Sequence, residues 1–172
     1  MGKNMRKRTK KTAHIIILML LCAAFILTAC AKAEYKKDVK PREIANALCE
    51  KIPMEGAWIG EDQSFIEEYV ILPEYVKESQ IYYAQSTNNL DEFGILLVEE
   101  GKAKAVKAIL MQRYLQKRYD ENREWYDSYM PIETPKLRDA EVRVYGNCVA
   151  YAILSPEGRT AFFSECEKLL KN

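Results

Sequence analysis

The feature that most constrains this chain is a short apolar segment near its start, because it fixes where a folded domain can begin. The first 14 residues are basic and polar, and residues 15–27 are thirteen apolar residues without interruption. As a helix this run is about 20 Å long, whereas the hydrocarbon core of a bilayer is about 30 Å thick. A basic start and an apolar run of this length are typical of a secretory signal peptide. An uncleaved membrane anchor is the alternative, and the shortness of the run argues against it.

The end of the apolar run forms a cleavage motif. Cys30 is preceded by Leu27, Thr28 and Ala29, and an apolar residue, two small residues and a cysteine resemble the bacterial lipobox. Small residues let a peptidase approach the backbone, and the thiol can take a diacylglyceryl group as a thioether. We therefore expect residues 1–29 to be removed. The acyl chains on Cys30 then hold the protein in membrane lipid, on the extracytoplasmic face of the cell membrane.

Removal of the leader reverses the charge of the chain. The whole chain has 26 basic and 25 acidic side chains, and six of the basic ones lie in residues 1–29, which contain no acid. The remaining 20 basic and 25 acidic side chains give a net charge of −5. A mildly acidic domain has no summed attraction for phosphate backbones, so we expect no nucleic-acid partner.

The histidine and cysteine content excludes several kinds of catalytic site. The one histidine, His14, lies in the leader, so the mature chain lacks Ser-His-Asp and Cys-His catalysis and His-ligated zinc. Three cysteines follow the lipobox at long spacings: Cys49, Cys148 and Cys166. We expect buried free thiols, with one disulfide as the alternative. We predict no catalytic residue, no metal site and no cofactor, which favours a non-enzymatic protein and leaves a carboxylate-dependent enzyme as the alternative.

The rest of the chain alternates between helical and strand-like patterns. We predict helices from Asp38, its N-cap, to residue 52, from Asp62 or Ser64 to about residue 69, over 102–129 and over 155–170. Strands are predicted at 79–85, 92–99, 140–145 and 148–154, and a loop at 57–60. This order predicts an α+β fold with two ββα units after N-terminal helices. We expect an antiparallel sheet of about four strands, with helices packed on one face. Residues 30–37 are assigned to a polar tether and residues 38–172 to a single extracytoplasmic domain.

Six residues are candidates for contact with a ligand or partner: Trp58, Asp91, Glu92, Arg118, Tyr126 and Tyr129. A tryptophan in a loop can stack on a sugar ring or anchor a protein. The acidic pair lies in a polar loop that can hold a cation through oxygen ligands. The arginine and the two tyrosines lie along the predicted long helix and can line a groove. Each group also has a purely structural explanation. Trp58 can pack over the first helix, and the acidic pair can belong to a hairpin turn. Arg118 can lie over an aromatic core formed by the tyrosines.

Several short motifs, in order, resemble one family. These are Asp38-Val39-Lys40, Leu90-Asp91-Glu92-Phe93-Gly94, Arg118 with Tyr126, Tyr129 and Pro131, then Leu137 and Gly146-Asn147. Together with the lipobox they resemble the uncharacterised DUF4358 lipoproteins of Gram-positive bacteria, over about residues 38–170. The resemblance implies a fold and a cellular location, and it implies no particular reaction. The chain departs from the family pattern at Asn122 and Cys148, where glutamine and an aromatic residue are usual.

These features favour a membrane-anchored lipoprotein that acts as a non-catalytic binding or interaction module. Its partner is expected to be an envelope protein or a wall component. One alternative is a hydrolase of cell-wall glycans that works through paired carboxylates, a chemistry that needs no histidine. Another is an accessory subunit of an envelope transporter.

Overall fold

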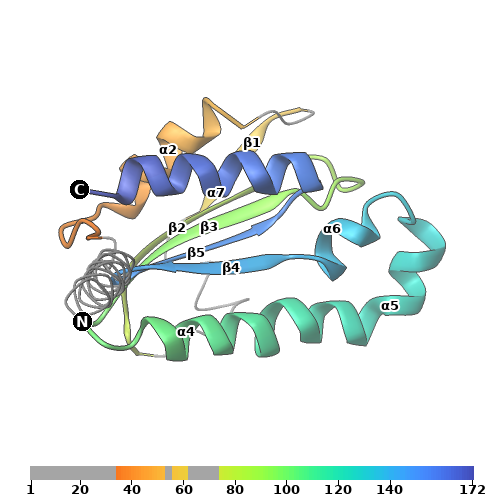
Figure 1. Cartoon of the computed structure of the whole chain (residues 1–172). Coiled ribbons are helices and arrows are strands. Elements are labelled where there is room, and N and C mark those ends of the chain that lie inside the picture. Colours follow the sequence, from red (N-terminus) through yellow and green to blue (C-terminus); the bar gives the residue numbers. More distant parts are fainter. Residues whose placement is uncertain (1–33, 53–55, 62–73) are drawn as a thin grey trace, which may run out of the picture. The chain divides into compact units, whose positions relative to one another are not determined.

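The computed structural model describes residues 34–52, 56–61 and 74–172, and its central element is an antiparallel sheet (Figure 1). The sheet has five strands in the order β1-β2-β3-β5-β4. They are β1 (Trp58–Glu61), β2 (Val76–Ala84), β3 (Glu92–Val98), β4 (Glu141–Tyr145) and β5 (Cys148–Ile153). All neighbouring strands are antiparallel. The predicted α+β class and antiparallel sheet are therefore confirmed, with one strand more than the four expected.

Both predicted hairpins are present, and the additional strand lies at the edge of the sheet. The β4–β5 turn contains Gly146 with φ of +64°, a left-handed conformation that glycine adopts without steric cost. β1 pairs with β2, with Trp58 opposite Ala84 and Glu61 opposite Ile81. We expected a loop at this position. Four residues that include a glycine show too little alternation to indicate a strand.

The helices cover both faces of the sheet, and this corrects the prediction of a single covered face. Helices α2 (Pro41–Cys49) and α7 (Pro156–Leu170) lie on one face. The other face carries α4 (Ala103–Ile109), η1 (Leu110–Gln116), α5 (Lys117–Tyr129) and α6 (Thr134–Arg138). Figure 1 shows α7 above the sheet and α4 below it. The reason lies in β3 and β5, which are buried along almost their whole length, because continuous apolar strands need cover on both faces.

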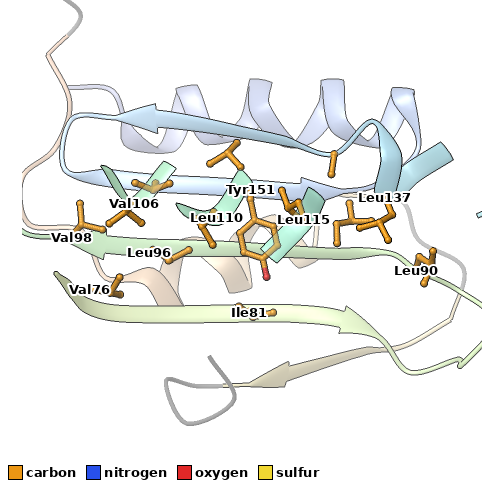
Figure 2. Close-up of a cluster of buried hydrophobic side chains, with 14 of the residues drawn as sticks. Val76, Ile81, Leu90, Leu96, Val98, Val106, Leu110, Leu115, Leu137 and Tyr151 are labelled. Atoms are coloured by element: carbon orange, nitrogen blue, oxygen red, sulfur yellow. The ribbon is translucent and has the colours of Figure 1, made fainter. Parts of the chain in front are cut away.

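Two apolar cores fill the space between the sheet and its helices. Figure 2 shows the core between the sheet and the helices α4 and η1, where Leu96 and Tyr151 from the sheet lie among Val106, Leu110 and Leu115. The second core contains Phe93, Ile95 and Ala150 of the sheet with Leu48 of α2 and Phe162, Phe163 and Cys166 of α7. Full burial of each large apolar side chain contributes about 1.5–3 kcal/mol. The central strands are thus held from both sides.

A π-helical segment divides the predicted long helix. The pattern 102–129 predicted one continuous helix, and the structure has α4, η1 and α5 in succession, with η1 a π-helix. The buried residues Val106, Leu110 and Leu115 are spaced by four and then by five. The spacing of five matches the wider π turn. At the start of this segment the buried face passes through Val106 and Leu110, whereas Ala105 and Ala108 are exposed.

The other helices agree with the sequence in part. Ser155 caps α7, and its hydroxyl accepts a hydrogen bond from the backbone N–H of Gly158 at 3.1 Å. The first helix begins at Pro41 with Lys40 as N-cap, so the prediction of Asp38 as the cap was wrong. The short helix α6 was not predicted. The helix expected from residue 62 or 64 lies outside the described residues.

The lipobox residues Leu27 to Cys30 also lie outside the described residues. Within the described part of the chain, no helix combines the length and apolar character that a bilayer crossing requires.

Candidate functional site

A cavity of about 470 Å³, lined by several charged residues, lies where β3 begins. One wall consists of residues 83–84 at the end of β2 and residues 89–92 before and at the start of β3. The opposite wall is helical and consists of residues 113–114, 117–118 and 121–122, from η1 and α5. The cavity therefore contains three of the six predicted contact residues, Asp91, Glu92 and Arg118.

Glu92 is the centre of a buried hydrogen-bond network behind this cavity. Glu92 is 4% exposed. Its Oε1 accepts hydrogen bonds from the hydroxyls of Tyr114 at 2.5 Å and Tyr151 at 2.7 Å. Its Oε2 accepts from Nη1 of Arg118 at 2.8 Å. Nη1 also donates to the Tyr114 hydroxyl at 3.1 Å, and Nε of Arg118 donates to the Tyr126 hydroxyl at 3.4 Å. A buried carboxylate is tolerated because it is paired and fully hydrogen-bonded.

The protonation states of this network are firmly set. Burial, followed by the charge of Glu92, raises the pKa of Tyr114 and of Tyr151 well above the ordinary value of 10. Burial is the largest single effect and lowers the pKa of Arg118, but the charge of Glu92, the interaction with Tyr114 and the hydrogen bonds to Tyr126 and Glu92 together outweigh it, so the pKa of this guanidinium is raised. Both tyrosines therefore stay protonated and the arginine stays charged at neutral pH.

Asp91 is held by a different cation. Nζ of Lys136 lies 2.7 Å from Oδ1 of Asp91 and 2.8 Å from Oε2 of Glu133. Glu133 in turn accepts a hydrogen bond from the backbone N–H of Leu90 at 2.9 Å, and Asn89 Oδ1 accepts from the N–H of Asp91 at 2.7 Å. The residues around α6 thus fix the loop that leads into β3.

The adjacent carboxylates of Asp91 and Glu92 therefore belong to two separate ion pairs. Asp91 is paired with Lys136, and Glu92 with Arg118. The cation site that we considered for this loop has no support from the geometry, since no group of three or more potential metal-binding side chains occurs in the described part of the chain. The hairpin-turn interpretation holds for Asn89, whose side chain bonds the backbone two residues ahead.

The structure separates the remaining predicted contact residues. Tyr126 is buried and joins the network through Arg118. Trp58 lies on the opposite face of the sheet, with its ring edge-on to Phe93 at 5.0 Å between centroids. We expected Trp58 either to contact a ligand or to pack over the first helix. It does pack against the domain, but the ring that it contacts belongs to strand β3. Tyr129 is 73% exposed at the end of α5.

Sequence reasoning missed three residues that hold this site together: Tyr114, Lys136 and Tyr151. Tyr151 carried a usable signal, because a tyrosine inside the apolar strand 148–153 needs a partner for its hydroxyl. Tyr114 and Lys136 lie on segments whose phase or existence we did not predict, η1 and α6.

The three described cysteines are free thiols, as we expected. Cys148 and Cys166 are buried in the core beneath α7, and Cys49 is half-buried in α2. Burial raises the pKa of Cys49 and of Cys148 to about 12. These thiols are therefore structural rather than nucleophilic.

Comparison with known proteins identifies a family without a named activity. Residues 56–154 match the model of DUF4358, a domain of unknown function. This match runs from before β1 to just after β5 and includes every residue of the cavity walls. No curated protein and no solved structure matches the chain. Since the matched segment is more than half of the sequence, the chain belongs to the DUF4358 family.

Proposed function

We propose that this protein is a membrane-anchored extracytoplasmic lipoprotein of a Gram-positive bacterium whose domain binds a polar ligand in the cavity at the start of β3. The carrying observation is the cavity itself, whose charged wall residues Asp91, Glu92 and Arg118 are already fixed by ion pairs. Walls that are ordered before a ligand arrives lose little side-chain entropy on binding. The lipobox and the family resemblance support the location.

Binding fits this site better than catalysis. A general acid or base works best with a pKa near the working pH. Here the pKa values of Tyr114, Tyr151 and Arg118 are raised, away from neutrality. Burial lowers the pKa of Lys136, but its hydrogen bonds to Asp91 and Glu133 outweigh this effect and raise it. The site offers fixed charges and hydrogen bonds, which suit recognition.

The location is tested by lipidation in cells. We expect the wild-type protein to incorporate a labelled fatty acid and to fractionate with membranes. Cys30→Ser should lose the label and appear in the medium, whereas Cys22→Ser should behave as wild type. A Cys30→Ser protein that stays in the membrane without label would refute the anchor.

The activity is tested with the full chain purified from membranes. Calorimetric titration with soluble fragments of cell-wall polymers should give saturable binding, and mass spectrometry of the same samples should show the fragments intact. Asn122→Ala should weaken binding, because this side chain lines the cavity. Cleavage of a fragment by the wild-type protein that is lost in folded Glu92→Gln protein would replace our proposal with the glycan hydrolase. Absence of binding to any fragment would contradict the binding function.

A further inference from the structure

Two exposed aromatic side chains lie on α5 next to the cavity. Trp125 is 51% exposed and Tyr129 is 73% exposed, and their ring centroids are 5.6 Å apart at an interplanar angle of 33°. Within the described residues, the only other large apolar side chain with comparable exposure is Ile132. We call Trp125 and Tyr129 the aromatic ledge. Exposed aromatic groups in a cluster commonly mark a binding surface.

The aromatic ledge continues the helical wall of the cavity. Glu121 and Asn122 line the cavity, and Trp125 follows them by four and three residues. Residues three and four apart are neighbours on a helix surface, with about 5–6 Å between Cβ atoms. Tyr129 follows Trp125 by four residues in turn. The wall from Arg113 to Tyr129 extends over about 24 Å of helix at 1.5 Å per residue.

A buried tyrosine supports the ledge and connects it to the site. The Tyr126 ring packs edge-on against Trp125 with centroids 5.3 Å apart. Its hydroxyl accepts a hydrogen bond from Arg118, which is paired with Glu92. The ledge is therefore backed by the same network that forms the cavity wall, and its position is fixed before a ligand binds.

The charges of the helical wall leave one cation available. Glu92 pairs with Arg118 at 2.8 Å, and Glu121 lies 3.7 Å from Lys117. Arg113 lines the cavity, is exposed, and forms no ion pair with any residue that the structure describes. An arginine in this situation can take a carboxylate in a bidentate pair.

The site lies at the far end of the sheet from the point where the chain enters the domain. Tyr35 packs against Tyr145 beside the β4–β5 turn, with ring centroids 5.5 Å apart. The cavity is at the other end of β3, whose seven residues extend about 20 Å. Figure 1 shows the β4–β5 turn and α5 at opposite ends of the domain. Tyr35 and the cavity therefore lie at opposite ends of the sheet.

We propose that the cavity and the aromatic ledge form one elongated site for a glycan chain that carries carboxylate groups. A sugar ring has hydroxyls at its edge and an apolar C–H face, and the site provides partners for both. Asn122 and Arg113 bind the polar groups and a carboxylate in the cavity, and Trp125 and Tyr129 stack against the following sugars. This inference rests on the proposed function and names its ligand class. A protein partner fits less well, because the exposed apolar surface here is a narrow stripe between charged residues.

The test uses two soluble probes that differ in their carboxylates. One is chitohexaose, a neutral hexamer of N-acetylglucosamine. The other is a peptide-free strand of three wall disaccharides, in which every second sugar carries a lactyl carboxylate. Each is titrated calorimetrically into the full-length protein. We expect the acidic strand to bind about tenfold more tightly than chitohexaose, since a hydrogen bond between two charged groups is stronger than one between neutral groups.

Three variants assign the contacts. Trp125→Ala should lower the affinity for both probes about tenfold. Trp125→Phe should retain most of the affinity, because stacking needs an aromatic ring. Arg113→Gln should weaken binding of the acidic strand about tenfold more than binding of chitohexaose, so that the preference for the acidic strand is lost. Arg123→Ala is the matched control, since this exposed side chain lies two residues before Trp125, on another side of the helix. It should bind both probes as wild type does.

Two outcomes would overturn the inference. If neither glycan binds, while another wall fragment binds in an Asn122-dependent manner, the ligand class is wrong and the proposed binding function stands. If the glycans bind but Trp125→Ala has native affinity, the ledge is not part of the site. Failure of every fragment to bind is the separate outcome that contradicts the binding function itself.

Discussion

Removal of Arg118 tests whether the buried ion pair holds the cavity in place. In Arg118→Met the carboxylate of Glu92 keeps its hydrogen bonds to Tyr114 and Tyr151 and loses the one cation that pairs with it among the described residues. Breaking a buried pair costs about 3–5 kcal/mol. The Arg118 side chain is 27% exposed, so water can approach the uncovered carboxylate, and we expect the low end, about 3 kcal/mol. For a domain of this size that is a fall in Tm of about 10 °C.

A double-mutant cycle isolates the pair from other effects of the substitution. Urea unfolding of Arg118→Met, Glu92→Gln and the double variant should give a coupling energy of about 2 kcal/mol. The matched control is the pair of Arg143 with Glu141, which has the same 2.8 Å separation but side chains that are 50% and 43% exposed. An exposed pair contributes about 0–1 kcal/mol. Equal coupling energies for the two pairs would refute the argument that burial makes this ion pair important.

Three further predictions concern packing and protonation. A Cβ added to Gly94 would lie 2.3 Å from the buried Tyr151 ring, so Gly94→Ala should cost about 1–3 kcal/mol in urea unfolding; Gly60→Ala should cost less, because the ring that it meets is partly exposed. Stability should fall as pH rises above 10, by up to about 1.4 kcal/mol per pH unit for each of Tyr114 and Tyr151. The reason is that the unfolded chain releases hydroxyl protons that the folded chain keeps until its raised pKa is passed. The free energy of unfolding in urea, measured at pH 9, 10 and 11, should fall less steeply with pH in Tyr151→Phe than in the wild type. An equal fall would contradict a raised pKa for Tyr151. Cys148, with its pKa raised by burial to about 12, should resist iodoacetamide at pH 8 in the folded protein and react in urea, as measured by peptide mass spectrometry.

Local patterns in the sequence were sufficient for most of the strands and helices. Alternation around Gly146 predicted the β4–β5 hairpin, and Ser155 with Pro156 predicted the start of α7. These signals are local, since a turn or cap is encoded within a few residues. The edge strand β1 gave no such signal, because it forms only through its pairing with β2.

The candidate site was only partly visible in the sequence because its contacts are distant along the chain. Asp91, Glu92 and Arg118 were identified by residue type and position. Their partners Tyr151 and Lys136 come from a strand and a helix 59 and 45 residues away. Such pairings depend on the order of the strands and on which face each helix covers, and we had placed all helices on one face.

The π-helical segment has a consequence for how this family can tolerate changes in chain length. Each residue of an α-helix turns the chain by about 100°, and η1 contains a wider turn between Leu110 and Leu115. A deletion of one residue in this segment would let it close into regular α-helix. The residues after it would keep their faces, because four α-helical residues turn the chain about as far as the five residues from Leu110 to Leu115 do here, so Arg118 would still face Glu92. A one-residue deletion in α4, which has no wide turn to absorb it, would instead rotate the following residues by about 100° and separate Arg118 from Glu92. Relatives that are one residue shorter here are therefore expected to lack that residue in η1 and to keep the ion pair.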